Sequence, residues 1–365
     1  MTHRFIKDVC DEISKYPRNI GSFGANYTKN FIKEFAIKNN LPLNVEEVNI
    51  KTSTSALLLK AKKLVTLNIL NEFKEPIEGK TLLLEVEKLR HINTLDGYIP
   101  VILLKDIVDI DLYKDKINSL KPKGVIFAIA DCSISFYQRI FNYDMPVFSI
   151  SQKDLEYVDE LTYISLVPEK EEQGVVENIF FDIGRGPIVY IITSIGSKEE
   201  SQGAIYSASS IALSLGLAKS FCKTYNSDFK FRFFFTEDDK TFEGIHKHID
   251  KKHKYVYYAI SIFNMGWTNK SYFYEDAYGE NAIYMGDKFY KYVKSLNQNV
   301  FFLKSNTLSF LHAPFKSKDI KTLMFGSYPC IISNTKYDNI ESLRFEELYA
   351  WFDILSGFLR RFHAL

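Results

Sequence analysis

One apolar stretch, followed by a polar loop and a periodic segment, constrains the fold of this chain more than any other feature. Residues Ile188 to Ile192 form an unbroken, mostly β-branched apolar run, which is typical of a strand buried on both faces of a parallel sheet. A polar loop follows over 194–202, and apolar residues then recur at helical spacing between 211 and 221. This order predicts half of a βαβ unit. Ligands of such sheets bind in loops at the carboxyl ends of the strands.

The same reasoning predicts further elements on both sides of this unit. We interpret Ser207, Ser209 and Ser210 as N-caps of the helix that follows the loop. Periodic or continuous apolar patterns predict helices over 2–13, 27–36, 287–296 and 348–362, and strands over 43–50, 178–183, 231–235, 255–263 and 300–303. The overall pattern is that of an α/β protein.

Bulk composition excludes several classes of function. The chain has 365 residues, of which 46% are hydrophobic and 25% charged, so it is long and apolar enough for two or three domains with full cores. A net charge of +1 gives no reason to expect a nucleic-acid partner or an anionic membrane. No apolar run approaches the roughly 20 residues that span a bilayer. We therefore expect a cytoplasmic protein, and the four scattered cysteines are expected to be buried free thiols.

The central loop carries a resemblance to a known family. Thr193 to Ser197 and Gly203 to Ser210 lie within IVYIITSIGS and GAIYSASSIA. This frame resembles the zinc aminopeptidases, a family that includes bacterial leucyl aminopeptidases and glutamate carboxypeptidase. In that family a strand leads into Ala-His-x-Asp-Ser and then Gly-Ala-x-Asp-Asn-Ala-Ser-Gly. The resemblance implies a mixed, mainly parallel central sheet flanked by helices.

Three further segments resemble the same family in the same order. Thr236 to Asp239 is similar to a strand that ends in a Glu-Glu pair, and Leu311 to Phe315 is similar to Ser-Asp-His-x-Pro-Phe, which places His312 on its His. Gly326 to Glu341 is similar to Gly-x-Pro, a strand, and His-Thr-x-x-Asp-x-x-Glu, and it predicts a strand over 330–332. The resemblance therefore covers nearly the whole chain.

The residues that would do the chemistry depart from the family. The resemblance places metal ligands on Ser194, Tyr206, Asp239, Asn264 and Asn334, the general base on Asp238, and the residue that orients the first ligand on Gly196. Catalytic zinc needs at least three protein ligands among His, Cys and carboxylates, and only one carboxylate remains at these positions. We expect no metal, no cofactor and no catalytic residue, with Asp238 as a degenerate base. These positions and His312 are expected to line a cleft.

The seven histidines offer no replacement site. His246 and His248 are two residues apart and so point to different faces of a helix, while His246 and His253 share a face without a third ligand nearby in sequence. We interpret this segment as an ordinary surface helix.

The pattern of predicted elements changes between residues 52 and 168. Short strands separated by polar turns precede a helix near 111–120. After this helix come Gly-Val-Ile at 124–126 and then Pro-Val-x-x-Ile-Ser before another helix. This order resembles the protease-associated domain that many of these aminopeptidases carry. We therefore predict an inserted, smaller α/β domain over 52–168 in a discontinuous aminopeptidase-like domain formed by 1–51 and 169–365.

Three functions remain open at this point. The first is an aminopeptidase-fold protein without zinc or peptidase activity, similar in this respect to the transferrin receptor ectodomain, which binds a peptide or protein, forms a homo-oligomer or pairs with an active relative. The second is a hydrolase with a rebuilt site, metal-free or holding one ion through Asp238, Asp239 and His312. The third is an active zinc aminopeptidase whose motifs align differently. The first is the function we expect.

Overall fold

A computed structural model divides the chain into two compact units, which we describe separately. The first contains residues 1–50, 174–305 and 310–365, and the second is built from 51–173. The structure describes residues 2–52, 55–60, 63–71, 73, 75–107, 109–132, 142–158, 163–168, 172–224, 228–237, 242–252, 255–267, 271–275, 280–303, 311–328 and 330–361. None of the helices in these ranges is both long and apolar enough to cross a bilayer.

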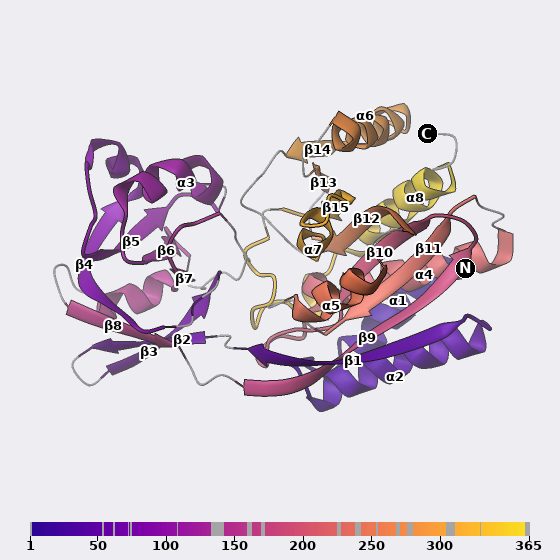
Figure 1. The fold of residues 1–365 in the computed structure, drawn as a ribbon, viewed down its shortest axis with the longest axis horizontal. Coiled ribbons are helices and arrows are strands. Elements are labelled where there is room, and N and C mark those ends of the chain that lie inside the picture. The colour runs from indigo at the N-terminus through magenta and orange to yellow at the C-terminus, as the bar shows by residue number, and fades with distance from the viewer. Residues whose placement is uncertain are drawn as a thin grey trace. The chain divides into compact units, whose positions relative to one another are not determined.

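The first unit is organised around one sheet of eight described strands (Figure 1). In spatial order the strands are β1 (Leu43–Thr52), β9 (Glu172–Gly184), β11 (Lys230–Thr236), β10 (Ile188–Ser194), β12 (Val256–Phe263), β15 (Lys321–Gly326), β13 (Ser271–Glu275) and β14 (Val300–Leu303). The pairs β11–β10, β10–β12, β12–β15 and β13–β14 are parallel, whereas β9–β11 and β15–β13 are antiparallel. This confirms the predicted mixed, mainly parallel α/β fold.

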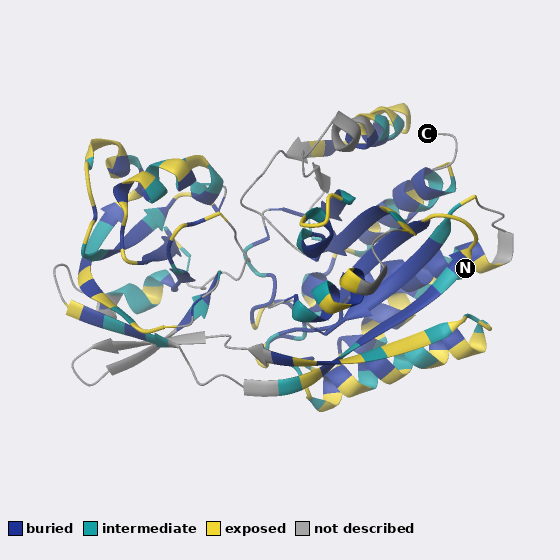
Figure 2. Ribbon diagram, viewed as in Figure 1, coloured by how far each residue is buried: buried dark blue, intermediate teal, exposed yellow. Residues whose placement is uncertain are grey.

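The predicted central strand occupies the middle of this sheet. All seven residues of β10 are buried, and Ile191 is level with Phe233 of β11 and Ile260 of β12. Figure 2 shows the central strands buried along most of their length. An apolar run without alternation forms a strand here because both faces are covered, so neither face selects polar side chains.

Helices cover both faces of the sheet (Figure 1). Val189 and Ile191 belong to a core shared with α1 (Thr2–Ile13), α2 (Phe23–Lys38), α4 (Ser209–Thr224), α6 (Glu280–Ser295) and α8 (Phe345–Arg360). Tyr190 points to the other face, where its ring contacts Phe315 of α7 (Ala313–Lys316) and His248 of α5 (Glu243–Lys252). The alternation of β10 therefore separates a mainly apolar layer, in which Thr193 Oγ1 lies 2.8 Å from Ser214 Oγ, from a layer that carries more polar groups.

The helix after the central loop begins differently from the prediction. A π-helical turn, Ala204–Ala208, precedes α4, and the residue before it, Gly203, has a left-handed conformation with φ 57°. The predicted serine caps were wrong. Ser207 Oγ donates a hydrogen bond to the carbonyl of Gly196 at 2.7 Å, and Ser209 Oγ donates to the carbonyl of Ile205 at 2.8 Å. Ser207 and Ser209 thus satisfy carbonyl groups instead of capping the helix, and Ser210 lies within α4.

Among its described residues, the second unit contains a closed barrel of strands and one α-helix. Its strands are β2 (Ser55–Lys60), β3 (Lys63–Ile69), β7 (Val147–Ser149), β6 (Val125–Ile129), β5 (Tyr98–Leu104), β4 (Ile77–Glu85) and β8 (Tyr163–Pro168), with α3 spanning Asp109–Leu120. Val101 and Ile126 share its apolar core with Phe148 and Leu166. The strands predicted through Val101 and Val125 thus belong to this barrel and not to the large sheet.

Several local predictions need correction. The strand expected over 330–332 is instead a turn, and the strand that leads to this region is β15, which ends at Gly326. Cys222 is exposed and Cys132 half-buried, so two of the four thiols are not in a core. His248 is only 1% exposed, so the helix interpreted as a surface element carries one fully buried histidine. Short helical turns η1 (Val86–His91), η2 (Gln152–Tyr157) and η5 (Ile340–Ser342) complete the described elements.

Candidate functional site at the carboxyl ends of the strands

The topology gathers the predicted site positions at one edge of the sheet. Ser194 is the last residue of β10, and Asn264 follows β12 directly. Asn334 lies in the segment after β15, and Tyr206 lies in the π-helical turn. Because β10, β12 and β15 are parallel, their carboxyl ends share this edge, as expected for α/β sheets.

Two of these positions adopt an unusual backbone conformation. Asn264 has φ 48° and Asn334 has φ 58°, both in the left-handed region. Asparagine tolerates this region better than other non-glycine residues because its short side chain bonds locally. Both asparagines are also buried, at 2% and 3% exposed. Backbone shape therefore gives a reason for asparagine here that is independent of metal binding.

The side-chain oxygens at the site accept hydrogen bonds from neighbouring protein groups. Asn334 Oδ1 accepts from the Lys198 amide at 2.7 Å, and Asn264 Oδ1 accepts from Ser333 Oγ at 2.5 Å. Ser194 Oγ accepts from the Gly196 amide at 3.1 Å. These bonds link the loop after β10, the end of β12 and the segment after β15, so the edge is crosslinked by amides and hydroxyls.

Asp338 ties the same segment to the start of the helix. Its carboxylate, which is fully buried, accepts hydrogen bonds from the amides of Ile205 at 2.6 Å, Tyr206 at 3.2 Å and Asn334 at 2.7 Å. Amides at the start of a helix are natural partners of an anion. Burial raises the pKa of Asp338 to about 6, against the opposing influence of these amides and of Arg18.

Arg18 forms the other half of this buried arrangement. It is fully buried, and its guanidinium donates to the carbonyls of Ile13 at 2.7 Å, Ile195 at 3.0 Å and Gly203 at 2.9 Å, and to Ser207 Oγ at 2.8 Å. Burial lowers the pKa of Arg18 to about 10, so it stays protonated at neutral pH. One cation therefore fastens the end of α1, the loop after β10 and the π-helical turn together.

Gly203 is required at this junction for two reasons. Its φ of 57° disfavours side chains, and an added Cβ would lie 2.6 Å from Ser197 Cβ and 2.7 Å from Arg18 Nη2. The glycine of the recognised motif thus makes room for the arginine.

Glu237 is a buried carboxylate that the sequence prediction missed. It follows β11 and is 1% exposed. Its Oε2 accepts from Lys29 Nζ at 3.0 Å and from the Glu177 amide at 2.9 Å, whereas its Oε1 has no hydrogen-bond partner among the residues that the structure describes. It is the first of three consecutive acids, and the family resemblance assigned roles only to the other two. Asp238 and Asp239, the other two, lie outside the described residues.

A second polar cluster, also missed, lies on the α5 face of the sheet. His248 Nε2 is 2.9 Å from the Tyr190 hydroxyl, and His248 Nδ1 is 2.5 Å from Glu46 Oε2. Arg232 Nη1 donates to the same hydroxyl at 3.1 Å and pairs with both carboxylate oxygens of Asp182 at 2.8 Å. Each ring nitrogen of His248 therefore has an oxygen partner, the Tyr190 hydroxyl at Nε2 and the Glu46 carboxylate at Nδ1.

His312 belongs to the same face. It precedes α7, is 2% exposed, and its Nδ1 lies 3.2 Å from Ser261 Oγ of β12. The structure thus gives His312 a buried partner on the strand, two residues before β12 ends.

The described residues at the edge do not fit a zinc site. No group of three or more His, Cys, Asp or Glu side chains that could hold a metal occurs among the residues the structure describes. Ser194, Asn264 and Asn334 are poor zinc ligands, and their side-chain oxygens already accept hydrogen bonds. Asp338, the described carboxylate closest in sequence to Asn334, is committed to three amides.

Comparison with known proteins defines the fold. No protein-family model matches the chain, and neither does any curated protein sequence. Solved structures do match. The aminopeptidase of Aneurinibacillus sp. strain AM-1 aligns with this chain at 14% identity and a TM-score of 0.63, and the alignment covers 98% of this chain and 93% of that chain. The zinc aminopeptidase BSAP of Bacillus subtilis matches at 16% identity and TM-score 0.64, with coverages of 98% and 94%.

A third match has the same extent. A peptidase M28 precursor from Shewanella amazonensis SB2B aligns at 14% identity and TM-score 0.62 over 99% of this chain and 92% of that chain. The chain therefore has the fold of zinc aminopeptidases over almost its full length. At these identities the likeness concerns the fold.

Proposed function

We propose that this protein keeps an aminopeptidase fold but has neither the zinc site nor peptidase activity, and that it acts in the cytoplasm by binding a peptide or protein partner. One observation carries the proposal. Of the five positions that the family resemblance assigns to metal ligands, four hold serine, tyrosine and two asparagines, and one, Asp239, keeps a carboxylate. Hydrogen bonds within the protein engage the oxygens of Ser194, Asn264 and Asn334.

The proposal explains how the loops stay in place without a metal ion. In a zinc site the ligands crosslink several loops through the ion. Here Asp338 and Arg18 connect the segment after β15, the loop after β10 and the start of α4 through direct hydrogen bonds. Each such bond contributes about 1 kcal/mol, and together they replace a metal as the crosslink.

The proposal also accounts for what the edge offers to a ligand. Ser194, Tyr206, Asn264 and Asn334 are nearly fully buried, so a ligand would contact the loops that carry them, and in α/β sheets these loops at the carboxyl ends of the strands are where ligands bind. Without an ion that acidifies water and polarises a carbonyl, such a site supplies binding but no activated nucleophile. The expected partner is thus a peptide or protein that is bound and released intact.

The test measures metal and activity on the same sample. Protein purified without chelator should contain well under one zinc per chain by elemental analysis, and it should leave aminoacyl chromogenic substrates uncleaved. An active zinc aminopeptidase purified in parallel serves as the control. Two stoichiometric zinc ions, or hydrolysis abolished by a chelator, would refute the proposal and favour the zinc aminopeptidase alternative.

A designed variant tests the positional assignment itself. It restores the family residue at every assigned position: Ser194→His, Gly196→Asp, Tyr206→Asp, Asp238→Glu, Asp239→Glu, Asn264→Asp and Asn334→His. This variant should bind zinc where the wild type does not. Circular dichroism establishes that it is folded, and a folded variant without zinc would show that the positions are wrongly assigned.

A further inference from the structure

The sheet of the first unit ends at a strand that has a neighbour on one side. In the described part of the chain, β14 is the last strand of the sheet and pairs with β13 alone. The free side of an edge strand presents backbone donors and acceptors that pair readily with another chain. Short length, lysines or a covering element normally protect such an edge.

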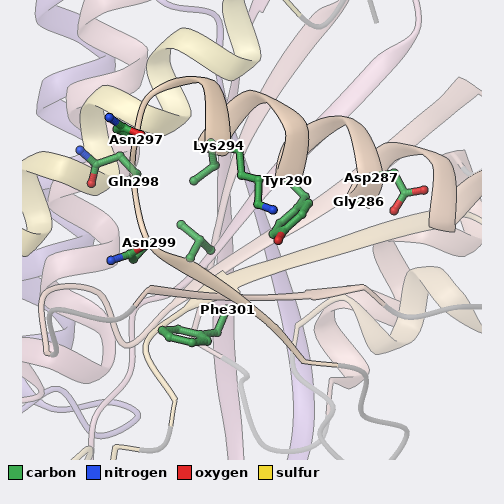
Figure 3. A pocket seen from close by; sticks show the side chains of 10 residues that line it. Gly286, Asp287, Tyr290, Lys294, Asn297, Gln298, Asn299 and Phe301 are labelled. Atoms are coloured by element: carbon green, nitrogen blue, oxygen red, sulfur yellow. The ribbon is translucent and has the colours of Figure 1, made fainter.

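A groove runs between this edge strand and α6. It has a volume of about 770 Å³ and is lined by Asp287, Tyr290 and Lys294 of the helix and by Asn299 and Phe301 at the strand. Figure 3 shows helix and strand as its two walls, with Tyr290 and Lys294 extending from the helix toward the strand. Tyr290 is 36% and Phe301 43% exposed, so the groove offers aromatic surface to solvent.

Opposite charges stand at the two ends of the helix wall. Asp287 and Lys294 are seven residues apart, which places them on one helix face about 10 Å apart. Lys294 Nζ lies 4.7 Å from the centre of the Tyr290 ring. Asp287 forms no ion pair with any residue that the structure describes. An acid at one end and a base at the other make this face complementary to itself when it is turned by 180°.

We propose that a second copy of this chain occupies the groove, forming a two-fold dimer in which β14 pairs antiparallel with the partner's β14. A two-fold axis turns each face onto itself, so a self-complementary face fits a second copy better than an acidic or a basic peptide. Asp287 then faces Lys294 of the partner subunit, and Lys294 faces Asp287 of the partner subunit. The pairing closes the open edge and covers both aromatic side chains. It is independent of the zinc question.

The first measurement is the mass in solution. Light scattering after gel filtration should give twice the 42.3 kDa of one chain. Asp287→Lys and Lys294→Glu each set like charges against each other at two symmetric contacts, so each should weaken the dimer at least about tenfold. The double variant Asp287→Lys/Lys294→Glu restores opposite charges and should restore the dimer. Both positions are exposed, so the monomers should remain folded.

Mixing supplies the sharpest readout. The Asp287→Lys chain carries two lysines at the groove and the Lys294→Glu chain two acids, so an equimolar mixture should form heterodimers although neither chain dimerises well alone. Lys336→Glu is the matched control because Lys336 is also an exposed lysine over a tyrosine ring, at 5.2 Å from Tyr337, and it should stay dimeric. A wild type that is monomeric at the highest soluble concentration overturns the proposal, even if it binds an added strand-forming peptide. So does a dimer that both reversals leave intact.

Discussion

Replacing Arg18 by methionine should lower the stability of the first unit by about 4 kcal/mol. The guanidinium donates to four buried acceptors: three carbonyls, of Ile13, Ile195 and Gly203, and the Ser207 hydroxyl. A buried acceptor left without its donor costs about 1–3 kcal/mol, so the lower bound for four is about 4 kcal/mol. Methionine keeps most of the apolar stem, so the loss reflects hydrogen bonds rather than a cavity. A domain with 5–15 kcal/mol of stability would lose a large share.

Tryptophan fluorescence during urea unfolding measures this loss for the right part of the molecule. Both tryptophans of the chain, Trp267 and Trp351, belong to the first unit, so the second unit does not contribute to the signal. Arg361→Met is the control, because Arg361 is exposed and stacks on Tyr292, and it should change the free energy of unfolding by less than about 0.5 kcal/mol. If the free energy of unfolding of Arg18→Met lies within about 1 kcal/mol of that of the control, the buried guanidinium is not the crosslink that we describe.

Two further predictions concern the other buried charges. The pKa of Asp338 is raised from 3.8 to about 6, so the folded state binds a proton that the unfolded state releases. The free energy of unfolding should therefore fall by up to about 3 kcal/mol as pH rises from about 4 to 6. In Asp338→Asn this pH dependence should disappear from urea unfolding measured across the same range, and if it persists it belongs to another group. Glu237→Ala leaves Lys29 buried without its closest carboxylate and should lower the free energy of unfolding by about 3 kcal/mol. The double variant Lys29→Met/Glu237→Gln should lose less than the sum of the two single variants. If the two losses simply add, the pair is not coupled.

The parts of the fold that the sequence predicted share one property: burial alone determines their pattern of apolar residues. The run Ile188 to Ile192 became β10 because a strand covered on both faces needs only apolar side chains. Strand β15 was missed because its apolar residues follow a lysine-rich stretch, whereas the apolar segment after it, Cys330 to Ile332, turns instead. That turn precedes Asn334, whose left-handed backbone is set by its contacts with Lys198 and Asp338. Long-range contacts of this kind leave no local pattern.

The assignment of the candidate residues to a site stays a prediction, and the sequence did not predict how they are bonded. Motif spacing placed Ser194, Tyr206, Asn264 and Asn334 on loops that the structure brings to one edge. Asp338 stood in a motif without a role and Arg18 was not predicted, because most of their partners are main-chain groups, which every residue has. His248 was taken as a surface residue because polarity on a helix usually means exposure. Its burial depends on Glu46 and Tyr190, which lie far away in sequence and come together only across the sheet.

The strand order has a consequence for how the chain assembles during synthesis. Strand β1 ends at residue 52, but its neighbour in the sheet, β9, starts only at residue 172. Strand β11 lies between β9 and β10 in the sheet and is synthesised after both of them. At 5–20 residues per second the ribosome needs roughly 10–35 s between completing β1 and completing β11. During that interval the edge of β1 and the apolar faces of α1 and α2 have no sheet to join. Nascent chains of this protein should therefore be chaperone clients until residue 236 has emerged, whereas every described strand of the second unit is complete by residue 168, so its barrel is free to fold first.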